Sequence, residues 1–74
     1  MNISDLVNLP SRNFTTSEEA DISCNLPEYC ELSEYRLEHT TGEVLHAVGD
    51  NLYRITRLGL VEFYDDLKRA VDSL

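Results

Sequence analysis

The middle of the chain alternates apolar and polar residues in short runs, which are separated by turn-forming residues. The first run reads Glu-Tyr-Arg-Leu-Glu-His from Glu34, a turn around Gly42 follows, and a Gly-Asp-Asn segment begins at Gly49. Strict alternation is typical of strands with one buried face, because successive side chains point to opposite sides of a sheet. The pattern predicts a three-stranded antiparallel meander with strands at about 34–40, 43–48 and 52–57. With His39 paired with Val44, one face of that meander carries Tyr35, Leu37, His39, Val44, His46, Val48, Tyr53 and Ile55.

A second apolar pattern, with helical spacing, occupies the C-terminal end of the chain. Its members recur at intervals of three and four residues, and charged residues fill the positions between them. This spacing predicts an amphipathic helix over about 60–73, entered at Gly59. Packed across the apolar face of the meander, the helix would complete an α+β fold. The apolar positions are Leu60, Phe63, Tyr64, Leu67, Ala70, Val71 and Leu74.

The N-terminal third allows two interpretations. Thr16 and Glu19 have the spacing of a capping box, which predicts a helix running toward Cys24. Over the same stretch, apolar and polar residues alternate from Ala20 onward, as they do in a strand. Nearer the start, Ser4 is a residue type that caps helices, and it predicts a single helical turn ending before the first proline. We therefore expect a short N-terminal arm, helical or extended, and favour the helical form.

The length of the chain limits the size of its core. Seventy-four residues make one small domain, residues 1–74. A chain of this length buries only about 60% of the surface of its unfolded form. The predicted meander also leaves Leu45, Ala47 and Leu52 on the face away from the helix. Because these side chains need a cover, from the N-terminal arm or from a second copy of the chain, we expect a homodimer.

Negative charge is concentrated between residues 18 and 43. The formal net charge of the chain is −8, and this segment contributes −7, from eight acidic residues against Arg36. Such a field repels nucleic acids and anionic membranes and attracts basic surfaces. We therefore expect a protein partner with a basic surface, and neither direct nucleic-acid binding nor membrane binding; an ordinary solvated surface is the alternative. The candidate partner-binding residues are Glu28, Glu31, Glu34, Glu38 and Glu43.

Four residues of the chain are of the types that bind zinc: Cys24, Cys30, His39 and His46. The predicted register places both histidines on one face, but the spacing C-x5-C-x8-H-x6-H lacks the closely spaced ligand pairs of zinc modules. We therefore expect no metal and no cofactor. We expect neither a signal peptide nor a membrane span, because the first residues contain no basic segment and no apolar run approaches ~20 residues. These features predict a cytoplasmic protein with reduced cysteines.

Catalysis is not expected from this sequence. It contains no glycine-rich phosphate loop, no nucleophile elbow and no His-Glu-x-x-His motif. A chain this short is also poorly suited to enclosing a substrate pocket of ~300 Å³ or more. In size and charge it resembles phage-encoded inhibitors of host defence enzymes, which implies a small inhibitor that blocks a basic, nucleic-acid-handling partner, in the limit as a mimic of nucleic-acid phosphates. The alternatives are an accessory subunit or antitoxin-like partner with an apolar interface, or a small zinc-stapled module.

Overall fold

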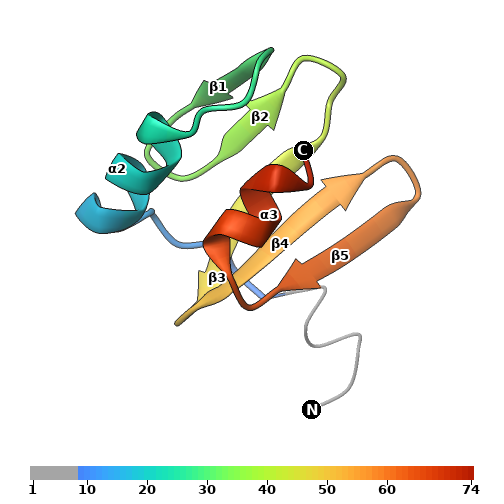
Figure 1. Cartoon of the computed structure of the whole chain (residues 1–74). Coiled ribbons are helices and arrows are strands. Elements are labelled where there is room, and N and C mark those ends of the chain that lie inside the picture. Colours follow the sequence, from blue (N-terminus) through green and yellow to red (C-terminus); the bar gives the residue numbers. More distant parts are fainter. Residues whose placement is uncertain (1–8) are drawn as a thin grey trace.

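The computed structural model describes residues 9–74, which form an antiparallel sheet with two helices packed on one of its faces (Figure 1). Neighbouring strands of the sheet follow chain order, β1-β2-β3-β4-β5. The predicted α+β class is therefore confirmed. Among these residues no helix is long and apolar enough to span a membrane. The elements are α2 (Thr16–Cys24), β1 (Cys30–Leu32), β2 (Leu37–His39), β3 (Val44–Gly49), β4 (Leu52–Arg57), β5 (Leu60–Tyr64) and α3 (Leu67–Asp72).

The sheet is larger than the predicted meander. Strands β2, β3 and β4 correspond to the three predicted strands, and β1 and β5 are added at the two edges. The residues of β5, Leu60–Tyr64, were predicted to begin the C-terminal helix, and that prediction was wrong. A two-residue turn at Leu58-Gly59, in which Gly59 has a φ of +74°, returns the chain along β4 before a helix begins. The helix is confined to Leu67–Asp72.

The register of β3 differs from the predicted one by a single residue. Leu37 lies opposite Leu45, where the prediction paired His39 with Val44. Because side chains alternate across a strand, this slip turns the β3 side chains to the other side of the sheet. Leu45 and Ala47 are therefore fully buried in the core. Val44 and His46, which were predicted to be buried, lie instead on the outer face, the face away from the helices, and are half-buried. Val48, at the irregularity that follows Ala47, is buried as predicted, with 7% of its surface exposed.

A β-bulge between Ala47 and Gly49 shifts the register of β3 against β4 by one residue. Gly49 lies opposite Leu52 across a two-residue turn, whereas Ala47 lies opposite Tyr53. The extra residue keeps the predicted β4 side chains on the core face although the β3 register has changed. Since Ala47 is covered from within the fold, it no longer supports the homodimer expected from the sequence.

The N-terminal arm contains the helix α2, which confirms the helical interpretation of this segment. Its capping box uses Thr15 and Glu18, one residue before the predicted pair. Glu18 N donates to Thr15 Oγ1 at 3.2 Å, and Thr15 N donates to Glu18 Oε1 at 2.8 Å. The helix turns Ile22 into the core, where it is fully buried. The helical turn predicted at Ser4 lies outside the described residues.

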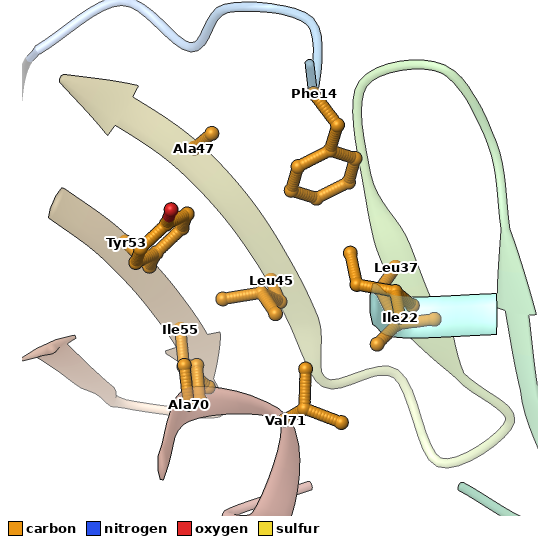
Figure 2. Close-up of a cluster of buried hydrophobic side chains, with 9 residues drawn as sticks. All are labelled: Phe14, Ile22, Leu37, Leu45, Ala47, Tyr53, Ile55, Ala70 and Val71. Carbon is orange, nitrogen blue, oxygen red and sulfur yellow. The ribbon is translucent and has the colours of Figure 1, made fainter. Parts of the chain in front are cut away.

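The core lies between the helices and the sheet (Figure 2). Phe14, just before α2, has only 5% of its surface exposed, and its backbone N donates to Glu34 O at 2.9 Å. Phe14 therefore closes the end of the core that lies away from Ala70 and Val71 of α3 (Figure 2). Each large side chain buried in the core contributes about 1.5–3 kcal/mol. The buried cluster consists of Phe14, Ile22, Leu37, Leu45, Ala47, Tyr53, Ile55, Ala70 and Val71.

Candidate functional site

An open groove of about 940 Å³ is lined by residues of α2, of the β3–β4 turn and of the start of α3. It brings together five acidic residues from three separate stretches of the sequence, against two arginines. Because the groove is open to solvent, it suits contact with another molecule better than enclosure of a small substrate. The acidic residues are Glu18, Asp21, Asp50, Asp65 and Asp66, the arginines are Arg12 and Arg69, and the other lining residues are Asn13, Thr15, Ser17, Asn51, Tyr53 and Leu67.

Glu18 is the shielded acid of the groove, with 12% of its side chain exposed. Its carboxylate accepts two hydrogen bonds from the Arg12 guanidinium, at 2.8 and 3.1 Å, one from Thr15 N at 2.8 Å and one from the Tyr53 hydroxyl. Arg12 also donates to Gly49 O, at 2.9 and 3.2 Å. The network therefore joins the N-terminal segment and α2 to β3 and β4 beneath the groove.

These contacts determine the protonation of both acidic groups in the network. The hydrogen bonds from Arg12, aided by Thr15 and Tyr53 and opposed by partial burial, lower the pKa of Glu18 to about 2. Burial, followed by the neighbouring Glu18 carboxylate, raises the pKa of Tyr53 to about 12. A general acid or base works best when its pKa is near the operating pH. Since neither group meets that condition, the pair connects parts of the fold and is poorly suited to proton transfer.

Asp21, Asp50 and Asp65 are the exposed rim carboxylates of the groove. They come from α2, from the β3–β4 turn and from the link between β5 and α3. Within residues 9–74, none of them forms an ion pair. Asp66 is used locally as the N-cap of α3, and Arg69 is the exposed cation beside it. Three exposed carboxylates gathered around one groove create a local negative potential that attracts basic side chains.

The glutamates predicted to bind a partner are spread over several parts of the molecule. Glu31 and Glu38 lie opposite each other on β1 and β2, on the outer face of the sheet. Glu38 also forms an ion pair with Arg36 at 3.4 Å, on the surface. Glu28 and Glu34 are exposed in the loops on either side of β1. Glu31 and Glu38 are therefore the two members of the predicted set that the fold places side by side.

Glu43, the last glutamate of the predicted set, belongs to a separate network centred on Arg57. Arg57 forms ion pairs with Glu43 and with Glu62, the latter at 2.7 Å, and its Nη2 donates to Ser73 O at 2.6 Å. The Tyr64 hydroxyl donates to Glu62 Oε2 at 3.3 Å. These contacts fasten the end of α3 to the sheet. Because its charge is balanced within the fold, Glu43 is a poor candidate for binding a partner.

The fold separates the four residues considered for zinc. Cys30 and His39 lie opposite each other on the core side of β1 and β2, whereas His46 lies on the outer face. The prediction that both histidines share a face was wrong, because of the β3 register. Cys24 is exposed at the end of α2. The pKa of His46 is lowered, mainly by burial of its side chain. Within residues 9–74, no group of three or more His, Cys, Asp or Glu side chains is placed to hold a metal ion.

The acidic groove was not predicted from the sequence. The sequence argument used Asp21 as part of the acidic segment, Asp50 as part of a turn and Asp65 as a polar position of the predicted C-terminal helix, and it did not connect them, since they are separated by 29 and 15 positions. The one local signal is the Asp65-Asp66 pair before α3, and a pair of this kind is common at helix starts. No protein-family model, curated protein or solved structure matches this chain. The geometry of the groove is therefore the basis for a functional assignment.

Proposed function

We propose that this protein is a small, acidic, non-catalytic binding protein and that its groove receives basic side chains of a protein partner. The observation that carries the proposal is the convergence of Asp21, Asp50 and Asp65 from three elements onto one open groove. Their charges are not balanced by ion pairs within residues 9–74, so lysine or arginine side chains of a partner would supply the missing cations.

The partner class that fits best is a protein whose surface is basic because it handles nucleic acid. Such surfaces carry clustered lysine and arginine side chains that contact phosphates. A net charge of −8 on 74 residues would speed the encounter with such a surface, and the rim carboxylates would take the positions of phosphates. The protein would then act as an inhibitor, by occupying the basic surface and excluding the nucleic acid.

A second candidate function is an accessory or antitoxin-like subunit with an apolar interface. One observation favours it: Leu58, at the tip of the β4–β5 hairpin, is fully exposed, and Leu60 beside it is 53% exposed. The two functions differ in their response to salt. Binding through the groove should weaken steeply as ionic strength rises, whereas binding through an apolar patch should change little. The zinc-stapled module has no comparable support, because no three of its candidate ligands within residues 9–74 are placed to share a metal ion.

The experiment compares two variants that lose the same amount of charge. The partner is captured from the native host with the unmodified protein and identified by mass spectrometry, and association rates are then measured at low and moderate salt. The groove variant carries Asp21→Asn, Asp50→Asn and Asp65→Asn, and the control variant carries Glu28→Gln, Glu31→Gln and Glu34→Gln. At low salt we expect the groove variant to associate about tenfold more slowly or worse, with a much smaller effect in the control.

The other outcomes are equally informative. If both variants slow association equally, attraction depends on net charge alone and the groove is not the contact surface. If neither variant changes the rate, the carboxylates only keep the protein soluble and the proposal fails. Asp66 and Glu18 are left intact because one caps α3 and the other joins α2 to β4, so a change in either would disturb the fold as well as the charge.

A further inference from the structure

Strand β5 is an edge of the sheet, and among the described residues no strand pairs with its outer side. In a two-residue hairpin the residues flanking the turn, here Arg57 and Leu60, form a hydrogen-bonded pair. Hydrogen-bonded and non-hydrogen-bonded pairs then alternate along the hairpin. The backbone N–H and C=O groups of Val61 and Phe63 consequently point away from β4, toward the open edge. A row of such groups is a template for another strand.

This edge lacks the features that usually prevent strand addition. Natural proteins protect edges with lysine, proline, bulges or very short strands. The opposite edge, β1, has such protection, since it is three residues long and places Glu31 on the outer face. The sequence of β5, Leu-Val-Glu-Phe-Tyr, contains no lysine and no proline. Its single charge, Glu62, is held by Arg57 at 2.7 Å on the helix side of the sheet.

We propose that β5 pairs in antiparallel orientation with β5 of a second copy of this chain, so that the two sheets become one. A two-fold axis beside Glu62 places Val61 opposite the partner subunit's Phe63 on the outer face. The same axis places Leu60 opposite the partner subunit's Tyr64 on the helix side. Each contact occurs twice by symmetry, and pairs of an aromatic with an aliphatic residue are among the more stabilising cross-strand pairs.

The charges of this edge favour a second copy over the basic partner proposed for the groove. The side chains that would meet across the axis are apolar or aromatic, apart from Glu62. Two glutamates would face each other at the axis, but each brings its own Arg57 as a balancing cation. A partner rich in lysine and arginine gains nothing from such an edge, whereas an identical apolar edge matches it. The proposal uses a different surface from the groove and does not depend on the proposed function.

The test measures mass against concentration, by analytical ultracentrifugation or by chromatography with light scattering. We expect a reversible monomer–dimer equilibrium in the micromolar range for the parent. Val61→Lys places a charge at the edge and should weaken the dimer by about tenfold or more. Thr56→Lys is the matched control, since Thr56 lies opposite Val61 on β4, on the same outer face, and is exposed. The control should dimerise like the parent, and circular dichroism verifies that both variants are folded.

A cross-linking experiment tests the register directly, and circular dichroism again verifies that each variant is folded. In a Cys24→Ser background, Glu62→Cys should form an intermolecular disulfide, because the proposed axis brings the two copies of this residue together. Glu31→Cys, on the opposite edge strand, should not form one. The proposal is overturned by a parent that stays monomeric at every concentration, by equal effects of Val61→Lys and Thr56→Lys, or by cross-linking that is as efficient at position 31 as at position 62.

Discussion

The hydroxyl of Tyr53 on β4 donates a hydrogen bond to the carboxylate of Glu18 on α2, 35 positions away in the sequence. The same carboxylate binds both Nη atoms of Arg12, whose guanidinium also reaches Gly49 O. Two ionised side chains, Glu18 and Arg12, thus join four segments at the edge of a small core. Hydrogen bonds to charged groups are roughly twice as strong as neutral ones, so we expect this network to make a measurable contribution to stability.

Glu18→Gln should remove that contribution and make the free energy of unfolding less dependent on pH in the acidic range. Folding lowers the pKa of Glu18 from its ordinary 4.5 to about 2, so the ionised form stabilises the fold above about pH 4.5, and this stabilisation is lost as the pH falls toward about 2. We expect the variant to lose about 2–3 kcal/mol of unfolding free energy at neutral pH. Urea titrations at several pH values measure both effects. Glu19→Gln, the neighbouring position outside the network, should behave like the parent; equal profiles for parent and Glu18→Gln would contradict the prediction.

Tyr53→Phe tests the other end of the same bond. Folding raises the pKa of Tyr53 from 10.0 to about 12, so the protonated hydroxyl stabilises the fold below about pH 10, and this stabilisation is lost as the pH rises toward about 12. The variant should be less stable at neutral pH by about 1–2 kcal/mol. An absorbance titration should show one late-titrating tyrosine that disappears in the variant. Tyr35→Phe, at an exposed position, is the control and should leave that late titration in place.

Leu45→Ala should be far more damaging than Leu67→Ala. Leu45 is fully buried at the centre of the sheet, and removing it should cost about 2–5 kcal/mol, enough to unfold much of a small domain. Leu67 begins the short helix α3 and is only half-buried, so its loss should cost about 1 kcal/mol. From the sequence, Leu67 would instead be placed in the middle of a long helix. Thermal melting of the two variants distinguishes the two structures.

Arg57→Lys should loosen the end of α3 while preserving the charge. Lysine cannot reproduce the planar fork with which Arg57 contacts Glu43, Glu62 and the Ser73 carbonyl. We expect a loss of about 1–2 kcal/mol, together with faster amide hydrogen exchange in α3. The matched control is Arg69→Lys, at an exposed position on the groove, which should stay within about 0.5 kcal/mol of the parent. Unchanged exchange in α3 would show that the network does not anchor the helix.

The segments α2 and 60–64 show what a local sequence pattern can predict and what it cannot. A helix at α2 was predictable because its capping signal is local, and the prediction missed the cap by one residue. Residues 60–64 were not predictable in the same way, because a short, mostly apolar run fits both a helical face and a strand. The turn at Leu58-Gly59 brings these residues alongside β4, and the backbone hydrogen bonds with β4 stabilise them as a strand. Because residues 60–64 form a strand, the C-terminal helix begins only at Leu67.

The sequence by itself determined that this chain has an α+β fold, with strands in the middle and helical segments toward both ends, and that it carries a strong negative charge. These properties follow from composition and from short-range periodicity, which need no knowledge of distant contacts. Only the tertiary structure decided which face of β3 is buried, because a one-residue slip in the pairing of β2 with β3 turns the β3 side chains to the other face. The bulge before Gly49 restores the predicted faces in β4, so the pattern of β4 gives no sign of the slip. The tertiary structure also decided where exposed carboxylates gather, since Asp21, Asp50 and Asp65 line one groove only when three separate elements pack together.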